Sequence, residues 1–480
     1  MQRRFLASSL LLLSLLTPAA PLAVAQKADA AKAQKGDQKM SAPRSIHLPI
    51  KEYKLKNGLR VVMSEDHAAP TYAISVTYDV GSRNERAGRT GFAHLFEHMM
   101  FQGSENVGKG EHFILVDNNG GSMNGTTNQD RTNYFESLPA NQLDLGLFLE
   151  ADRMRSLAIN QANLDNQRNA VQEEKRLGDD NQPYGKTYET ILDNVYENFA
   201  YKHTVIGSMD DLNAATVQDV ADFFRIYYAP NNAVLTLVGD FQPEEALAKV
   251  KKYFEAIPAQ PAPPALNMTE PEQKAERRKT IEDAFARTPR LDIVFKIPQA
   301  NTPDYYALSV LSSVLSGGQS SRLYQKMVKE AQVATAAFGG PELRRGPSMF
   351  SIAVFAQPGK DLAQIEQLVY AELERLKNEP VADWELEKAR MGLRNSRAQS
   401  LQSTLSRAVT LGQYTVYFND PNLINTYESK YNAVTKDDIQ RVARAYFKDT
   451  NRTVVTTLPK PKAAPTSGGG TANTTRTGGR

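Results

Sequence analysis

The chain has 480 residues, a formal net charge of +3 at pH 7 and no cysteine. A charge so close to neutrality, without a basic stripe interleaved with aromatic residues, argues against a nucleic-acid-binding protein. The lack of cysteine excludes a disulfide framework and a lipid anchor on cysteine, and the length suffices for two or more domains.

The first 25 residues predict a cleavable signal peptide. Arg3 and Arg4 precede an apolar run over 5–16, which is shorter than the roughly 20 residues that span a bilayer. The small residues of Ala23-Val24-Ala25 predict cleavage after Ala25 and export to the periplasm. The arginine pair leaves a twin-arginine signal as the alternative, which the leucine-rich apolarity of the run disfavours.

The mature chain is expected to begin with a disordered lead-in followed by strands. Residues 26–45 are rich in Ala, Lys and Gln, a composition typical of disorder. A hairpin is expected over 53–63, where Asn57-Gly58 supplies a type I′ turn, and the alternation of 72–78 predicts another strand. No later segment reaches about 18 consecutive apolar residues, so we expect no membrane span.

The stretch 91–101 combines a helical apolar pattern with a chemical motif. His94 and His98 are four residues apart and Glu97 falls between them, so one helix face carries all three. The remaining positions are almost all apolar, so the helix should be buried and its polar groups need partners. A buried hydrogen-bonded histidine pair is the ordinary alternative. However, the chain has only six histidines, and His-x-x-Glu-His is an inverted zinc motif in which two imidazoles ligate the metal.

Two segments after this helix predict an antiparallel pair of strands. They are 122–128 and 132–137, with a turn at 129–131. The first is polar and flat, as edge strands often are, and an edge beside a metal site can accept an extended peptide. An ordinary solvated edge explains the pattern equally well. The candidate peptide-binding residues are Ser122, Met123, Asn124, Gly125, Thr126 and Thr127.

The helix expected over 163–177 offers a third metal ligand. Its inward stripe by spacing contains Leu164, Gln167, Val171 and Glu174, whereas Glu173 points towards solvent. A zinc site with two histidines needs one more protein ligand, which makes Glu174 the better candidate of the two glutamates. Spacing alone leaves open whether Glu174 meets the histidines.

The chain also contains an internal repeat. Asn213–Val220 is echoed by Asn432–Ile439, and Tyr227-Tyr228 is echoed by Tyr446-Phe447. A repeat this long indicates two duplicated domains rather than a solenoid. We expect an α+β fold in which each domain is a mostly antiparallel sheet with packed helices. The helix expected at 305–316 contains neither His nor Glu, so only the first copy can hold the metal.

With these motifs in place, the chain resembles the pitrilysin/insulinase family of inverted-motif zinc peptidases over roughly residues 48–460. It is most similar to the compact bacterial branch related to mitochondrial processing peptidase. The matching features are the His-x-x-Glu-His motif, Glu174 after 75 intervening residues, and the segments 181–185 and 203–207.

The resemblance implies a zinc endopeptidase that hydrolyses peptides or unfolded polypeptides. It assigns one Zn²⁺ per chain to His94, His98 and Glu174, and the role of general base to Glu97. Gln167 departs from the pattern, because many relatives have a glutamate there that supports the zinc ligands. An amide can still form a hydrogen bond at that position, so we expect tuned rather than lost activity.

The resemblance and the composition together give domain boundaries. We expect a signal peptide at 1–25, a lead-in at 26–45 and a zinc-binding catalytic domain at 46–255. A Pro-rich and then charged linker follows at 256–287. A homologous metal-free domain should occupy 288–459, and the Pro-, Gly-, Ser- and Thr-rich residues 460–480 predict a disordered tail.

The resemblance further implies a partner subunit. In the heterodimers of the family, one subunit carries zinc and the other carries an Arg and, seven residues later, a Tyr that bind substrate. Alignment on 321–323 places Val328 and Thr335 at those positions, so this chain looks like the zinc subunit. A self-sufficient homodimer using Arg322 and Tyr324 is one alternative. The other is a non-catalytic scaffold, although this chain keeps all four motif residues.

Overall fold

The computed structural model describes residues 47–461. The expected signal peptide (1–25), the lead-in (26–45) and all but the first two residues of the expected tail (460–480) lie outside the described residues. Within 47–461, no helix is long and apolar enough to cross a membrane.

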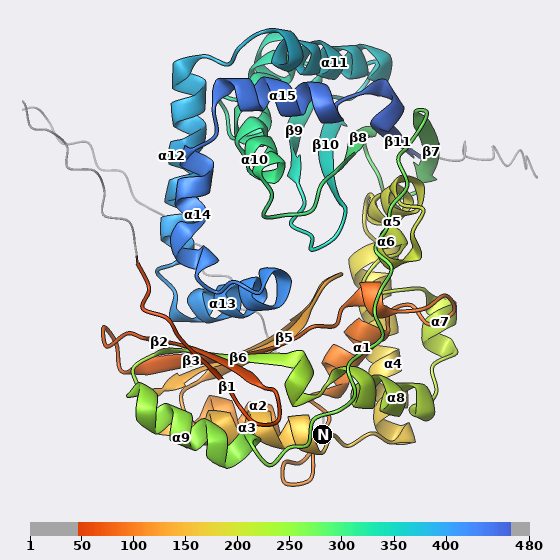
Figure 1. Cartoon of the computed structure of the whole chain (residues 1–480). Coiled ribbons are helices and arrows are strands. Elements are labelled where there is room, and N and C mark those ends of the chain that lie inside the picture. Colours follow the sequence, from red (N-terminus) through yellow and green to blue (C-terminus); the bar gives the residue numbers. More distant parts are fainter. Residues whose placement is uncertain (1–46, 462–480) are drawn as a thin grey trace, which may run out of the picture. The chain divides into compact units, whose positions relative to one another are not determined.

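The first sheet has six strands and ends at the predicted edge strand. Figure 1 labels β1, β2, β3, β5 and β6 of this sheet. In spatial order they are β1 (Lys51–Lys54), β2 (Arg60–Glu65), β6 (Ala233–Gly239), β3 (Thr71–Tyr78), β5 (Thr132–Pro139) and β4 (Ser122–Thr127). Only β2 and β6 pair in parallel; the other neighbours are antiparallel. The central strands β3 and β6 are buried along almost their whole length. The predicted hairpin, the second strand and the edge position of β4 are therefore confirmed. The predicted type I′ turn is wrong, because only Gly58 has a positive φ (90°), and the Leu55 N–H donates to the Leu59 carbonyl across a three-residue loop.

The helices of the first half are α1 (Phe92–Met99), α2 (Glu111–Asn118), α3 (Leu143–Arg155), α4 (Gln161–Lys175), α5 (Gly185–Val195), α6 (Phe199–Lys202), α7 (Met209–Asn213), α8 (Val217–Tyr227) and α9 (Pro243–Phe254). All but α5 and α6 contribute buried residues to one apolar core with this sheet. Buried apolar residues of α5 and α6 form a separate cluster with Val294, Met349 and Val455. Helix α4 continues into a π-helical turn, Arg176–Asp180. Short 3₁₀ turns occur at Ser82–Asn84, Ala140–Gln142 and Pro230–Asn232.

The second sheet has five strands in the order β7 (Arg277–Asp283), β11 (Arg452–Pro459), β8 (Arg290–Ile297), β10 (Ser348–Ala356) and β9 (Ala334–Pro341). Its helices are α10 (Pro303–Ser316), α11 (Leu362–Asn378), α12 (Asp383–Ser400), α13 (Thr404–Phe418), α14 (Leu423–Asn432) and α15 (Lys436–Tyr446), with a π-helical turn at Tyr324–Glu330 and a 3₁₀ turn at Asp449–Asn451. The α+β class with two sheets and packed helices is confirmed.

The repeated segments adopt the same local structure in both halves. Thr216 caps α8 and Thr435 caps α15, each by accepting a hydrogen bond from an aspartate N–H three residues later. At the other end, the Asn232 side chain donates to the Tyr227 carbonyl at 2.8 Å, and Asn451 donates to Tyr446 at the same distance. Such matching caps at both helix ends support the duplication.

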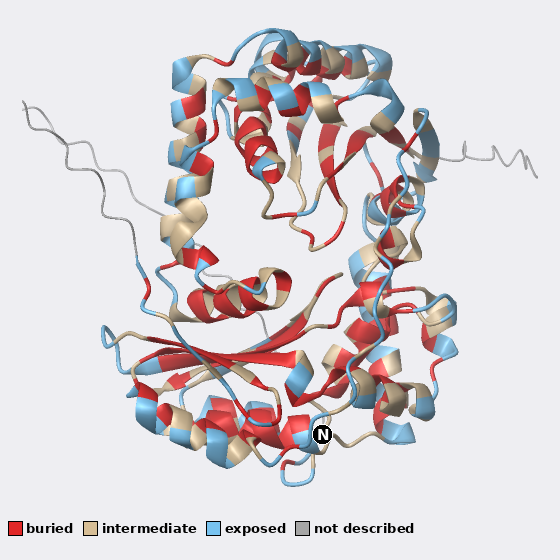
Figure 2. Ribbon diagram, in the orientation of Figure 1, coloured by how far each residue is buried: buried red, intermediate tan, exposed pale blue. Residues whose placement is uncertain are grey.

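The two halves exchange one helix each. Helix α13, from the second half, packs on β3 and β6 of the first sheet, and Thr236 Oγ1 donates to the Ala408 carbonyl at 2.9 Å. Helix α5, from the first half, packs on β7, β8 and β11, with Thr187 and Thr457 hydroxyls 2.8 Å apart. Figure 2 shows α13 coloured as buried or half-buried along its length.

Strand β7 lies within the segment 256–287 that the composition assigned to the linker. It pairs in parallel with β11 at the edge of the second sheet, and its residues are mostly exposed or half-buried. Its charged sequence concealed it, because an edge strand facing solvent carries no continuous apolar pattern.

Candidate active site

Helix α1 presents two chemically different faces. Phe92, Leu95, Phe96 and Met99 are buried in the first core. The opposite face packs towards α4 and β4 and carries His94, Glu97 and His98, which are only partly buried. The apolar face therefore anchors the helix and leaves the polar motif facing a pocket.

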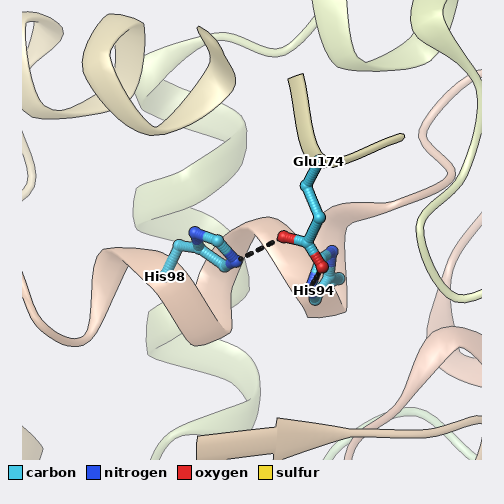
Figure 3. Close-up of side chains that lie close together, drawn as sticks. All are labelled: His94, His98 and Glu174. Carbon is cyan, nitrogen blue, oxygen red and sulfur yellow. Dashed lines mark ion pairs between the residues drawn. The ribbon is translucent and has the colours of Figure 1, made fainter. Parts of the chain in front are cut away.

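The structure brings His94, His98 and Glu174 together (Figure 3). Glu174 lies in the last turn of α4, and its carboxylate oxygens are 3.5 Å from His94 Nε2 and 3.3 Å from His98 Nε2. All three potential ligand atoms lie within 4.8 Å of one another. Unlike Gln167 and Val171, which are buried, the Glu174 side chain is 49% exposed, because its end of α4 opens into the pocket.

The protonation state of His94 and a hydrogen bond to His98 suit a divalent metal. Burial, with the neighbouring His98 adding to it, lowers the pKa of His94 to about 4, so its imidazole is neutral and can donate a lone pair at neutral pH. Gln167 Oε1 lies 3.3 Å from His98 Nδ1, a contact that directs His98 Nε2 towards Glu174. Two imidazoles and one carboxylate are a donor set that zinc accepts in catalytic sites.

Glu97 lies between this cluster and the edge strand. Burial raises its pKa, and a hydrogen bond from Thr127 partly opposes that shift. A methyl group on Gly125 would lie 3.1 Å from Glu97 Cγ, so β4 runs directly beside the carboxylate. Residues 125–127 of β4, together with His94, Glu97 and Glu174, line a pocket of about 430 Å³.

The outer edge of β4 offers backbone groups to this pocket. Asn128 N–H donates to the Arg131 carbonyl at 3.0 Å in the β4–β5 turn. Since hydrogen-bonded and non-hydrogen-bonded pairs alternate in an antiparallel ladder, the N–H groups of Met123, Gly125 and Thr127 face away from β5. The six residues predicted to bind a peptide therefore form the edge strand beside Glu97, in which Met123, Gly125 and Thr127 present their backbone outwards and the Gly125 N–H donates to Asn124 Oδ1 at 2.8 Å.

Other residues of the pocket were not predicted. Lys175, Asp179, Tyr188 and Glu189 line it from the end of α4 and from α5, and Thr204–Ile206 line it from a loop. For the loop, the sequence contained one indication, the match of 203–207 to the family pattern, and that match assigned no function to these residues. The α5 residues could not be predicted, because the position of α5 depends on its packing against the second sheet.

Arg322 is engaged elsewhere. Its Nε and one terminal nitrogen each lie 2.8 Å from the Glu385 carboxylate, and its side chain is 9% exposed. Val328 packs against the second core. A guanidinium fixed by a bidentate, nearly buried ion pair is poorly placed to contact substrate, which weighs against the homodimer alternative that relied on Arg322.

Comparisons with known proteins agree with this geometry. Residues 60–208 match the family model described as insulinase (peptidase family M16), and residues 214–393 match the model described as peptidase M16 inactive domain. The chain is 32% identical to the zinc protease PqqE of Helicobacter pylori, over 84% of this chain and 92% of that protein.

Two further similarities cover most of the chain. It is 23% identical to the probable mitochondrial-processing peptidase subunit beta of Schizosaccharomyces pombe, over 81% of this chain and 87% of that one. The crystal structure of a protease from Helicobacter pylori superposes with a TM-score of 0.83 at 31% identity, covering 86% of this chain and all of that structure. The chain thus belongs to the insulinase, or M16, family of peptidases, as its inverted motif and its two homologous halves predicted.

Proposed function

We propose that this chain is a zinc-dependent endopeptidase that hydrolyses peptides or unfolded polypeptides. The observation that carries the proposal is the convergence of His94, His98 and Glu174 beside Glu97 and an open strand edge. His94, His98 and Glu174 would hold one zinc ion. Zinc in such a site polarises the scissile carbonyl and makes water more acidic.

Residues of the chain would carry out proton transfer and bind the peptide. Glu97 takes a proton from the attacking water and passes it to the leaving amine, a role that its partly buried position beside the cluster supports. The peptide lies extended along Ser122–Thr127 and pairs with the outward backbone groups of β4. A recess of about 350 Å³ that includes Phe113, Ile114 and Met123 adjoins the start of β4 and would receive an apolar substrate side chain.

The test of this function is the substitution Glu97→Gln. The amide keeps the size of the side chain but cannot accept the proton, so we expect unchanged zinc content and loss of peptide hydrolysis. Zinc is measured by elemental analysis and turnover with a quenched fluorescent peptide library. Wild-type turnover in Glu97→Gln would contradict the assigned role.

We also propose that the chain acts as the zinc subunit of a heterodimer, with a homologous partner that lacks the zinc motif and carries an Arg/Tyr pair. Support comes from Val328 and Thr335 at the aligned positions and from the ion pair that occupies Arg322. The domain limits given above are part of the same proposal, with the catalytic half ending near 255 and its homologue, expected from 288, extended to begin at β7 near Arg277. A periplasmic location after cleavage at Ala25 is also part of it.

A further inference from the structure

The start of the metal helix is fixed by a buried carboxylate from outside the motif. Gly91 occupies the N-cap of α1 with φ of 84° and has no side chain with which to cap the helix. Glu85 does so instead: its two oxygens accept hydrogen bonds from Gly91 N–H at 2.9 Å and Ala93 N–H at 2.8 Å. A carboxylate there satisfies free N–H groups and complements the positive end of the helix dipole. Ala93, the second of these donors, immediately precedes His94.

His203 completes this cap. Its Nε2 lies 3.0 Å from Glu85 Oε2 and from the Ser82 carbonyl, and its Nδ1 lies 3.0 Å from the Phe199 carbonyl. All of these partners are acceptors, so the ring satisfies them only as a doubly protonated imidazolium. The Glu85 side chain is 0% exposed and that of His203 is 12% exposed, so the two charges depend on each other.

The pKa directions are consistent with this pairing. Burial alone would lower the pKa of His203, but the hydrogen bond and charge of Glu85 raise it above its ordinary value. Burial raises the pKa of Glu85, and His203 and the two backbone donors oppose that shift.

The loop that carries His203 also forms the pocket wall. Thr204–Ile206 line the pocket, and a methyl group on Gly91 would lie 2.5 Å from the Ile206 carbonyl oxygen, so the loop touches the backbone of the helix start. Ser208 N–H donates to Thr90 Oγ1 at 3.1 Å, and Thr90 N–H donates to Asp211 at 2.9 Å. One segment thus contacts both the pocket and Thr90-Gly91, at the N-cap of α1.

From these contacts we infer that Glu85 and His203 are a positioning pair, which aligns the first turn of α1, and with it His94 and Glu97, against the pocket-wall loop and Glu174. The inference rests on the proposed function for its consequence in catalysis. Loss of the pair frees the first turn, weakens zinc binding by about tenfold, as is typical for residues that support metal ligands, and lowers kcat more than it raises KM.

The experiment compares Glu85→Gln and His203→Gln with His112→Gln. His112 and Glu136 form a second His–Glu pair, with Nε2 and Oε1 2.6 Å apart and side chains 6% and 0% exposed, but on α2 and β5 rather than at the start of α1. The control therefore removes a similarly buried pair. Zinc affinity is measured by chelator competition, kcat and KM with a peptide substrate, and Tm by calorimetry. Hydrogen exchange over residues 91–99 is measured in zinc-free protein.

The expected result is faster exchange over 91–99, weaker zinc binding and lower kcat in Glu85→Gln and His203→Gln, with the double variant little worse than either single one. His112→Gln should lose Tm only. Unchanged exchange and zinc affinity in the two variants, with a Tm loss like that of His112→Gln, would overturn the inference. Because exchange is read without zinc, faster exchange in a protein that proves to bind no zinc would reject the proposed function and leave the positioning role standing. If Glu85→Gln does not fold, His203→Gln decides, because it leaves the Glu85 carboxylate and its two backbone N–H donors in place.

Discussion

Two adjacent glutamates at the end of α4 have different surroundings. Glu174 points at both histidines, whereas Glu173 is exposed and forms an ion pair with Arg176 at 3.1 Å. We expect Glu174→Gln to lose zinc and Glu173→Gln to keep it, because only Glu174 supplies a charged ligand atom to the site. Zinc content after dialysis of both variants checks this, and equal retention would remove Glu174 from the ligand set.

A second group of acidic side chains is buried between β5, which carries Glu136, and α3, which carries Glu150. Glu136 and Glu150 are fully buried near His112 and Arg153. Burial raises the pKa of each to about 7, and Arg153 opposes the shift. With a single guanidinium beside two carboxyl groups, the folded state keeps protons that the unfolded state has released.

The pH dependence of stability follows from that difference. Both folded pKa values lie above the ordinary value of 4.5, so these two groups bind fewer protons in the unfolded chain between about pH 4.5 and 7, and their contribution to the unfolding free energy falls as pH rises through this window. Burial lowers the pKa of His94 to about 4 and that of His112 to about 3, so these two groups contribute with the opposite sign. We therefore expect the Tm of Glu136→Gln, relative to that of the wild type, to increase between pH 5 and 8. Glu173→Gln serves as the control and should follow the wild-type curve. Parallel curves for all three proteins would contradict the assignment.

At the residue scale, much of the candidate site was predictable. The spacing of His94, Glu97 and His98 placed them on one face, and the helical stripe distinguished Glu174 from Glu173. Glu85 and His203 were not predictable as a pair, because their contact joins positions 118 residues apart and neither lies in the motif. The exposure of Glu174 was also not predictable. Residue spacing indicates which face of a helix a side chain occupies, but not whether a solvent-filled pocket lies next to that face.

At the scale of elements, Gly125 sets the separation between β4 and α1. A Cβ there would lie 3.1 Å from Glu97 Cγ and 3.2 Å from Tyr134 Cδ1. We expect Gly125→Ala to displace Glu97 and lower kcat about tenfold with zinc retained, because displacements of about 1 Å in an active site can cost up to about 100-fold.

The control for this substitution is Gly178→Ala in the π-helical turn. A Cβ on Gly178 would meet no atom within 4 Å in the described structure, so kcat should stay at the wild-type value. Equal activity of the two alanine variants would show that β4 can move away without disturbing the carboxylate.

Elements with a strong local signal were predicted well. The hairpin over 53–63 follows from alternating residues around an Asn-Gly pair, and the edge strand follows from the polar, flat sequence of 122–127. Strand β7 was missed because its partner, β11, lies about 175 residues later, and a charged edge strand resembles a linker locally. The parallel pairing of β2 with β6 likewise depends on contacts that no local pattern encodes.

At the scale of the whole molecule, the proposed heterodimer predicts that peptide hydrolysis requires a partner subunit. The purified chain alone should bind zinc and show little turnover, and addition of a homologous subunit with the Arg/Tyr pair should restore it. Zinc content, turnover of the peptide library and size-exclusion profiles with and without the product of a neighbouring homologous gene check this. Robust turnover by the chain alone would replace the heterodimer with a self-sufficient peptidase, and a chain that takes up no zinc would point to a scaffold.

The duplication was predictable at this scale, but the exchange of helices was not. The repeated segments around Asn213 and Asn432 predicted two similar halves, and their matching caps are present. Which sheet a helix covers is decided by long-range packing. The apolar residues of α13 could pack on either sheet, so its place on the first sheet could not be predicted from its own sequence.

That exchange determines how the protein would respond to a protease. A cut in the Pro-rich connection near 258–265 would leave two fragments that each hold a helix against the other's sheet, through the contacts of Thr236 with Ala408 and of Thr187 with Thr457. The nicked chain would remain interlocked, and each fragment made separately would expose a sheet face that its own helices do not cover. The Pro-rich connection at 258–265 is therefore a poor place to divide the chain into separate fragments. Both halves should unfold together in one cooperative transition.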